Sequence, residues 1–427
     1  MIKNDFLTVY IKSILIKHIR YRRWIMDKRI GTYIRKARIE KSYSQEGLCK
    51  GICAVSYLSK IELGQVHASQ EIIQMLFQRL DLYYETDSAY LKEVKQSIEE
   101  CYHLLFHAFD ISKLKEKVLN LKKNEKRLSS SPFFLDFYLL ENISILMKKD
   151  IPSLQTVQEE SIQNSLHSLE EYIETMDQRQ YELYTLSNAL LYEKEELFEK
   201  VVKLNPCAFY TDVYGSWLFI KGKYVRAVEL LQRAYDNALQ EGSLYLALDA
   251  KFSQGMCYTS LDETLMLESF QIAIEFAKAL QKEDLVFAAY YNIATYYMEI
   301  GKMDVAYSYL IQYEHKDVLY AHKMAICLEN LHKKEEALIW IHKGREYENV
   351  NDLDMLILDV VEYRLTHENY KKDNIYIDML MHTFERLQKE RAKGFAYYHL
   401  SYVLEVLEAN RKYKEAYYML KKFSQKF

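Results

Sequence analysis

The stretch Ser44–Gly64, SQEGLCKGICAVSYLSKIELG, decides the fold of the N-terminal part of this chain. A capping serine opens it, a short helical segment follows, and residues 51–53 form a tight turn. After the turn, Ala54, Leu58 and Ile61 recur at i, i+4 and i+7, which gives a second helix one apolar side and leaves the other side free. Two short helices joined in this way are typical of a helix-turn-helix.

The free side of the second helix carries residue types that can read DNA. With the buried direction set by Leu58 and Ile61, serines and a lysine point outward, and a valine and a tyrosine flank them. A hydroxyl donates or accepts hydrogen bonds, a lysine suits guanine or phosphate, and a valine can contact a thymine methyl group. The predicted DNA-binding residues are Gln45, Val55, Ser56, Tyr57, Ser59, Lys60, Arg35 and Lys36. The spacing alone also fits a helical hairpin of a larger bundle, in which these side chains would face water.

Segments on both sides of this stretch complete a small helical domain. Residues 28–40, KRIGTYIRKARIE, place apolar residues on one face at helical spacing and basic residues around it. We expect one arginine of this first helix to pair with Glu62. Residues 71–80, EIIQMLFQRL, form the helix that closes the core. The predicted helix-turn-helix domain therefore covers residues 26–81.

The motif within the opening stretch resembles the Cro/CI (XRE) type of helix-turn-helix. The matching string is Gln45-Glu46-x-Leu48, Ile52-Cys53 and Ser56-x-Leu58-Ser59-Lys60-Ile61-Glu62-x-Gly64. Its shortened turn, with Cys53 where many relatives have glycine, is similar to the turn of the peptide-pheromone-regulated Rap, NprR, PlcR and PrgX (RRNPP) family. The resemblance implies that Gln45 contacts the DNA backbone and that Val55, Ser56 and Lys60 face the bases.

The composition indicates an all-α protein. The 427 residues include only 11 Gly and 3 Pro, where average usage would give about 30 and about 20. Residues 1–64 contain 14 Lys and Arg against 5 Asp and Glu, so they carry +9 and the rest of the chain carries −13, within a total of −4. A basic head on an acidic body fits a DNA-binding domain whose body is not itself attracted to phosphate.

The cysteines, the histidines and the N-terminal segment give weaker signals. The six cysteines lack metal-binding spacing and are predicted to be apolar packing residues of a reduced, cytoplasmic protein. His103 and His107 have i, i+4 spacing but no clear third ligand, so packed histidines are favoured over a metal site. Residues 1–25 fit neither a signal peptide nor a membrane span. We expect them to be a disordered or loosely helical extension before a natural start near residue 26; a basic helix that touches DNA or an anionic membrane is the alternative.

An explicit repeat begins near residue 210. Gly222-Lys223-x-x-x-Ala227 is echoed by Gly301-Lys302-x-x-x-Ala306, and Lys-x-x-x-Ala recurs at Lys333 to Ala337 and Lys412 to Ala416. Ala227 and Ala306 lie 79 residues apart, as do Ala337 and Ala416, so each interval holds two units of about 40 residues. A small residue after each turn lets two paired helices approach closely.

These repeats resemble tetratricopeptide repeats in the longer form used by the same peptide-regulated family. The resemblance covers residues 210–425 well and 130–205 weakly. We predict an all-α fold in which the helix-turn-helix domain is followed by a helical linker region at 82–130 and a tetratricopeptide-like solenoid at 131–427.

A solenoid of helix pairs has a concave surface, which is the expected ligand site. Aligning Gly301 with the turn glycine of the repeat places Asn292 on or near this surface. Its carboxamide both donates and accepts, so it can bond an extended peptide backbone, and in the resembled family an asparagine at such a position holds the signal peptide. The alternative is a surface asparagine bonded to a neighbouring helix. The predicted peptide-binding residues are Asn292, Tyr291, Thr295, Met298, Tyr258, Gln254, Ser216 and Phe219.

The sequence therefore predicts a transcriptional regulator whose binding to a double-stranded DNA operator is controlled by a short signalling peptide on the concave face. A homodimer is expected because one small head reads few base pairs. The alternative is a Rap-like protein that sequesters a response regulator or promotes its dephosphorylation through the repeats. The sequence contains no Gly-rich phosphate loop, nucleophile motif or convincing metal site, so no enzyme activity, cofactor or membrane partner is expected.

Overall fold

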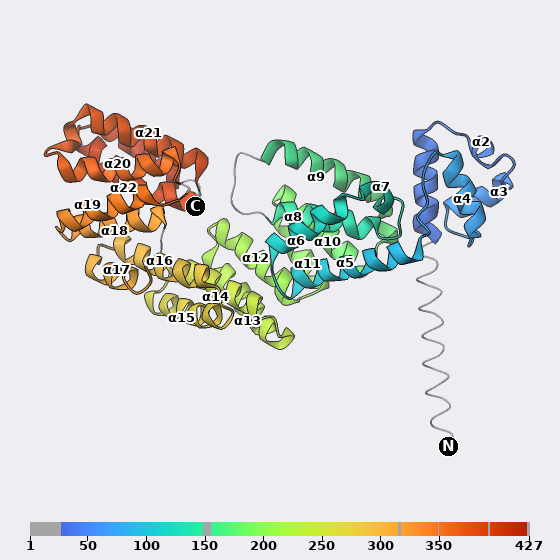
Figure 1. Ribbon diagram of the computed structural model, residues 1–427, viewed down its shortest axis with the longest axis horizontal. Helices are drawn as coiled ribbons and strands as arrows, with labels where there is room; N and C mark the ends of the chain where they lie inside the picture. Colours follow the sequence, from blue (N-terminus) through green and yellow to red (C-terminus); the bar gives the residue numbers. More distant parts are fainter. Residues whose placement is uncertain (1–26, 148–154, 315–316, 349, 392, 425–427) are drawn as a thin grey trace, which may run out of the picture. The chain divides into compact units, whose positions relative to one another are not determined.

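The structure is a computed structural model that describes residues 27–147, 155–314, 317–348, 350–391 and 393–424. Every regular element in these residues is a helix, which confirms the all-α prediction (Figure 1). Within the same residues, no helix has the length and apolar character that crossing a membrane requires. The expectation about residues 1–25 concerns a segment outside this description.

The chain forms two compact units. The first ends at Asn205, and the second begins at Pro206 and also includes His107–Phe109. The domain boundaries predicted near residues 81 and 130 both fall inside the first unit. The helices that follow the head are therefore packed with it rather than with the later repeats.

The head occupies residues 27–80 at the beginning of the first unit. Its helices are the one over residues 27–40, α2 (Gln45–Cys49), α3 (Val55–Glu62) and α4 (Gln70–Arg79) (Figure 1). Ser44 caps α2 by accepting from the backbone N–H of Gly47, as the sequence predicts. Apolar side chains from all these helices form one core, which includes Ile34, Leu48, Leu58 and Leu76.

The remainder of the first unit is a bundle around one largely buried helix. Its elements are α5 (Ser88–Phe106), α6 (Ile111–Lys122), α7 (Glu125–Leu128), α8 (Phe134–Leu146), α9 (Gln155–Leu169), the 3₁₀ helix η2 (Glu170–Thr175), α10 (Gln178–Tyr192) and α11 (Glu195–Leu204). Helix α8 contacts α5, α6 and α10, and most of its side chains are buried. A helix that is apolar on most sides needs neighbours on most sides, which α8 has.

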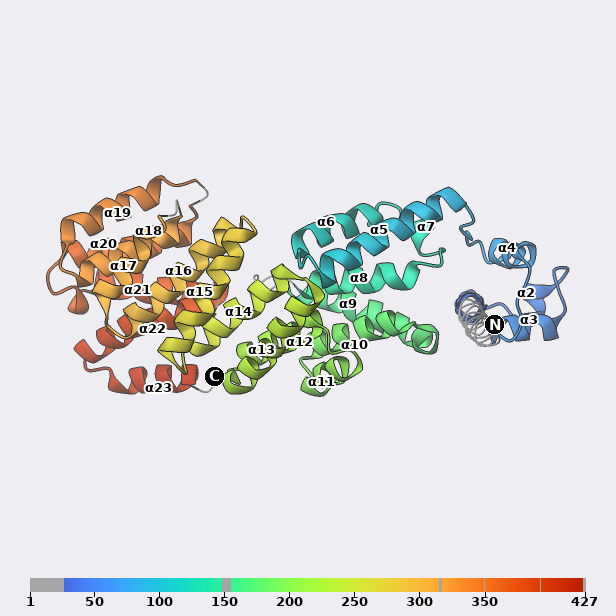
Figure 2. The same ribbon diagram turned by 90° about the horizontal axis from the view of Figure 1, so that it is seen from below.

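The second unit is a stack of antiparallel helix pairs (Figures 1 and 2). Its helices are α12 (Ala208–Ile220), α13 (Tyr224–Glu241), α14 (Leu244–Tyr258), α15 (Glu263–Ala279), α16 (Glu283–Glu299), α17 (Met303–Leu310), α18 (Val318–Asn330), α19 (Lys334–Glu346), α20 (Asp352–Thr366), α21 (Asn374–Glu390), α22 (Lys393–Ala409) and α23 (Tyr413–Ser424), with the 3₁₀ helix η3 (Tyr370–Lys372) after α20. Helix α12 contacts α14, α16 contacts α18, α18 contacts α20, and Arg364 of α20 lies against Tyr402 of α22, so alternate helices lie side by side in a layer of the stack. We call it the even layer.

The repeat spacing read from the sequence corresponds to these helix pairs. Ala227, Ala306, Ala337 and Ala416 lie on α13, α17, α19 and α23, and each is buried. The two intervals of 79 residues therefore span two pairs each, and the short interval spans one, as predicted. A buried alanine at these positions takes little space, so the paired helices can pack closely.

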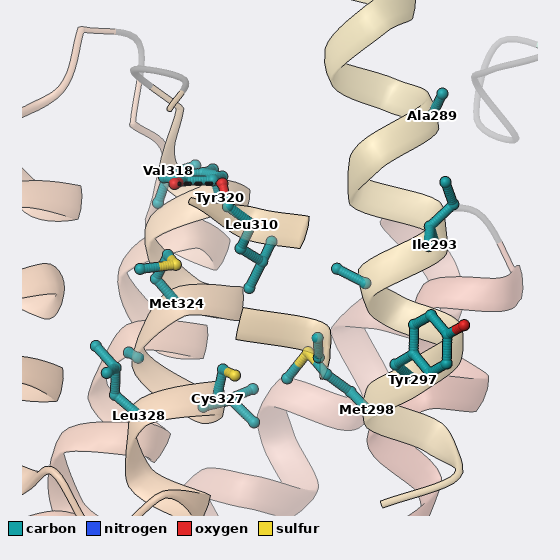
Figure 3. Packing of buried hydrophobic residues seen from close by; sticks show 14 of the residues in the cluster. Ala289, Ile293, Tyr297, Met298, Leu310, Val318, Tyr320, Met324, Cys327 and Leu328 are labelled. Carbon is teal, nitrogen blue, oxygen red and sulfur yellow. Dashed lines mark hydrogen bonds between the residues drawn. The ribbon is translucent and has the colours of Figure 1, made fainter. Parts of the chain in front are cut away.

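The core of the second unit runs continuously between neighbouring pairs. In Figure 3, Met298 of α16 lies next to Cys327 of α18, whereas Ala289, Ile293 and Tyr297 lie along another side of α16 within the same core. Such burial fixes the side of each even-layer helix that is available to a ligand, because the opposite side is taken up by packing.

Candidate DNA-binding and ligand-binding sites

A buried carboxylate joins three helices of the head. Arg38, on the 27–40 helix, donates from Nε to Oε1 of Glu62 at 2.6 Å and from NH2 to Oε2 at 3.1 Å. The Glu62 side chain is 3% exposed, and its Oε2 also accepts from Gln45 Nε2 at 2.8 Å. The prediction that an arginine pairs with Glu62 is confirmed. The pair fixes α3 against the first helix, and Gln45 adds α2 to the same contact.

The backbones of the 27–40 helix and α3 approach each other directly. A Cβ atom added at Gly31 would lie 2.0 Å from the carbonyl oxygen of Ile61, so only glycine fits there. On the other side of the head, Arg79 of α4 donates to the carbonyl of Leu48 at 3.0 Å and to that of Lys50. The 27–40 helix therefore contacts α3 through both its backbone, at Gly31, and a side chain, Arg38, while Arg79 joins α4 to α2.

The free side of α3 presents an apolar group, a hydroxyl and an ammonium. Val55 is 42% exposed, and Ser56 and Lys60 are exposed as predicted. Tyr57 and Ser59 are half-buried, and the Tyr57 ring packs against the head core. Arg35 is exposed on the 27–40 helix. These groups can contact base edges and phosphates without rearrangement of the core.

Two predicted DNA contacts have other partners. The Gln45 amide is half-buried and directed at Glu62, which orients it inward. The Lys36 ammonium donates to the carbonyl of Ser168 at 3.2 Å. Both side chains therefore have protein partners in the structure, and their contacts with DNA stay a prediction. Sequence spacing could not show this, because Ser168 is more than a hundred residues away from Lys36.

The residue that anchors the head within the first unit was missed by sequence reasoning. Arg29 is 6% exposed, and its NH2 donates to the carbonyl of Thr175 at 2.8 Å and to Oε1 of Gln180 at 2.9 Å. Its NH1 donates to the carbonyl of Pro132 at 3.2 Å. In the sequence Arg29 is one of several basic residues on the same helix, and nothing local distinguishes it. The guanidinium couples the head to η2 and α10.

Asn292 and Thr295 lie half-buried on α16 in the even layer. Asn292 Nδ2 donates to the carbonyl of Ala288 at 2.7 Å, and Thr295 Oγ1 donates to the carbonyl of Tyr291 at 2.8 Å. Both bonds stay within α16, so the bond to a neighbouring helix that was the alternative for Asn292 is not found. Within the described residues the Asn292 carboxamide oxygen receives no hydrogen bond and remains an acceptor for a ligand.

Three predicted peptide contacts are buried. Met298 is 4% exposed and belongs to the core between α16 and α18 (Figure 3). Gln254 is 1% exposed, and it donates to the carbonyl of Val228 at 3.2 Å and accepts from Lys251 at 2.8 Å. Ser216 is buried on α12. The repeat alignment placed these residues on helices of the even layer, but a rotation of one residue, 100°, decides between surface and core. The structure corrects these three assignments.

The other two candidates are half-buried. Tyr258 packs beside the core of the second unit, and the Phe219 ring lies 5.9 Å from that of Tyr224. Burial raises the pKa of the Tyr258 hydroxyl, with Cys257 adding to the effect. Both side chains could therefore contribute apolar ring surface to a ligand contact.

The even layer contains a group of buried and half-buried charged and aromatic residues, of which only Tyr291 was predicted from the sequence as a ligand contact. It consists of Tyr291, His322, Lys323, Arg364, Tyr398, His399 and Tyr402, which come from α16, α18, α20 and α22. We call it the inner cluster. The Lys323 ammonium lies 3.0 Å from the ring centre of Tyr398 and 5.6 Å from that of Tyr291. A lysine inside the apolar segment VLYAHKMAICLEN was a sequence signal that could have found it.

The two cations of the inner cluster, Arg364 and Lys323, differ in their hydrogen-bond partners. Arg364 donates to both carboxylate oxygens of Glu329, at 2.8 and 2.6 Å, and its guanidinium lies 4.3 Å from the ring centre of Tyr402. Lys323 is 2% exposed, and within the described residues no carboxylate or carbonyl bonds its ammonium. Burial lowers the pKa of Lys323 to about 7, and the nearby Glu299 opposes the change.

Two histidines pack beside Lys323. Their Nε2 atoms lie 3.4 Å apart, and Nδ1 of His399 lies 2.9 Å from the carbonyl of Phe395. Burial lowers the pKa of His399 to about 3 and that of His322 well below its usual range. Both imidazoles are therefore neutral at pH 7. The described residues contain no group of three potential metal ligands, here or elsewhere.

Comparison with known proteins identifies the class of the head. Residues 34–85 match the helix-turn-helix family, and this part of the chain is a helix-turn-helix domain of the XRE type. No match was found among curated protein sequences.

Solved structures share the fold of most of the chain. The apo form of the quorum sensor NprR from B. thuringiensis aligns with a TM-score of 0.52 and 15% identity, over 78% of this chain and 99% of that chain. The apo form of RapI aligns at 0.56 and 14%, over 78% and 98%. A Rap protein complexed with Competence and Sporulation Factor aligns at 0.50 and 13%, over 78% and 98%. The fold of these helical-repeat proteins is therefore the fold of this chain.

Proposed function

We propose that this chain is a DNA-binding transcriptional regulator whose operator binding is controlled by a short peptide bound to the even layer. The observation that carries the proposal is the exposed Val55, Ser56 and Lys60 face on a helix-turn-helix domain that precedes a helical-repeat body. Helix α3 is fixed to the rest of the head on its buried side, by Arg38 and by the close approach at Gly31. Its exposed side is therefore available to bind DNA.

The peptide part of the proposal is supported by the even layer. The Asn292 carboxamide and the half-buried Thr295 lie on the same helix as Tyr291, at spacings that an extended peptide could follow. A Rap protein with this fold is solved as a complex with Competence and Sporulation Factor. By the same proposal the protein acts as a homodimer, because two heads would read two half-sites.

A second candidate function is kept because Rap proteins share this fold just as NprR does. In this alternative the repeat body sequesters a response regulator or promotes its dephosphorylation. In the first candidate function α3 binds DNA sequence-specifically, and in the second it does not need to.

Selection of bound duplexes from a random-sequence DNA pool by the full chain tests the proposed function. We expect the wild type to enrich a sequence motif, and Lys60→Ala with Ser56→Ala to abolish the enrichment. Lys334→Ala, which changes an exposed lysine on α19, is the matched control and should enrich the same motif. Wild-type protein that enriches no motif would favour the second candidate.

A further inference from the structure

We propose that the inner cluster binds a carboxylate of the peptide, with the Lys323 ammonium and the Tyr291 hydroxyl as its donors. This inference rests on the proposed peptide binding. It specifies the chemical class of the ligand: a peptide with a carboxylate, from a side chain or the C-terminus, that contacts Lys323 on α18.

The first support is the missing counter-ion of Lys323. A buried ammonium is costly unless an anion or several acceptors surround it. Arg364, on the next helix of the even layer, has such an anion in Glu329. Lys323 is also buried, and among the described residues its ammonium contacts the faces of two aromatic rings and no acceptor. The nearby Glu299 lies beyond ion-pair distance among the described contacts.

The second support is an independent orphan donor beside it. The Tyr291 hydroxyl is buried, and it has no hydrogen-bond partner among the residues that the structure describes. Its ring centre is 5.6 Å from the Lys323 nitrogen. Buried hydroxyls in native proteins nearly always have a partner. One carboxylate has two oxygens, and it can accept from both donors at once.

The remaining neighbours would not compete for that carboxylate. His322 and His399 are neutral at pH 7, and the Arg364 guanidinium is already occupied by Glu329. Two further charges act on the Tyr291 hydroxyl, Arg391 and Asp317. Arg391 is paired with Asp354, and Asp317 accepts from the backbone N–H groups at the start of α18. The cluster also lies next to accessible surface. Thr295, one turn along α16 from Tyr291, is half-buried, and Tyr397, adjacent to Tyr398, is 49% exposed. Tyr291, Tyr398 and Tyr402 are themselves half-buried, so part of the inner cluster borders the surface.

The test uses the full chain and four synthetic heptapeptide pools of randomised sequence. The pools either contain or lack Asp and Glu, and they end in either a free carboxylate or an amide. Retained peptides are separated by ultrafiltration and identified by mass spectrometry. We expect the wild type to retain peptides that carry a carboxylate at least about tenfold more than those that carry none. Two of the pools carry a carboxylate from one source alone, either the Asp and Glu side chains or the free C-terminus. Comparison of these two pools shows which source supplies the bound carboxylate.

Variants connect the preference to the cluster. Lys323→Met should bring the retention ratio close to one, while the circular dichroism spectrum stays helical, since methionine suits a buried site. Tyr291→Phe removes only the hydroxyl and should lower the ratio about fivefold. Lys334→Met should leave it unchanged. Equal retention of peptides without any carboxylate, or an unchanged ratio in Lys323→Met, would overturn this inference and leave peptide binding standing. Retention of no peptide from any pool would overturn the proposed function and this inference together.

Discussion

Arg38 holds Glu62 with two charge-assisted hydrogen bonds across the interface between the first helix of the head and α3. Glu62→Gln keeps the size of the side chain but removes the negative charge from a contact that is 3% exposed on the Glu62 side. We expect it to destabilise the docking of α3 by about 2 kcal/mol.

Hydrogen exchange of the α3 amides in the full chain measures this loss, as roughly 30-fold faster exchange. Glu46→Gln is the matched control, because Glu46 is exposed on α2. Equal protection of α3 in both variants would mean that the ion pair does not hold the helix.

Arg29→Met should loosen the head from η2 and α10. The substitution removes donors to Thr175, Gln180 and Pro132 and leaves these acceptors buried, at a cost of about 2 kcal/mol. Amides of the 27–40 helix should then exchange faster, and Arg35→Met, on an exposed position of the same helix, should show no change. If the Arg29 variant keeps wild-type protection, the guanidinium does not anchor the head.

The local features of the fold follow from the sequence, and the long-range ones do not. Ser44 as a cap, the stripe of Leu58 and Ile61, and the spacing of Ala227 and Ala306 depend on neighbours within a few turns of helix, so periodicity identifies them.

The contacts that decide the candidate sites join residues far apart in the chain. Arg29 meets Gln180, and Lys323 meets Tyr398, and no spacing rule connects such pairs. The error at Met298 has another cause. An alignment that is correct for the helix can still be wrong by one residue in rotation, which moves a side chain from surface to core.

Asn292→Ala should remove the response to peptide and leave DNA binding without peptide intact. The carboxamide bonds only its own helix, so its loss should not disturb the packing of α16. Asn330→Ala is the matched control, because Asn330 makes the same kind of bond to the carbonyl of Ile326 at 2.9 Å. Titration of a selected duplex with and without a retained peptide measures both properties. A response that persists in Asn292→Ala would exclude this residue from the ligand site.

Lys323 should make the second unit less stable as the pH falls from about 10 to about 7. Burial lowers the pKa of this lysine to about 7 in the folded chain, whereas the unfolded chain takes up the proton near its ordinary value of about 10.4. Across that window the unfolded state binds more protons, so its stability relative to the folded state rises on acidification. Below pH 7 both states are protonated and the slope ends.

Urea unfolding at pH 7 and pH 9 detects this effect. From pH 7 to pH 9 the free energy of unfolding of the wild type should rise by up to about 2 kcal/mol more than that of Lys323→Met, which has no titrating amine at this position. Lys334→Met should follow the wild type. Parallel behaviour of wild type and Lys323→Met would show that the buried amine has its ordinary pKa.

The central claim is that a peptide on the even layer changes how α3 binds DNA. The most direct measurement is the dissociation constant of the full chain for its selected duplex, with and without saturating retained peptide. We predict a change of at least about tenfold in wild type and no change in Asn292→Ala. A dissociation constant that the bound peptide leaves unaltered in wild type would contradict the account.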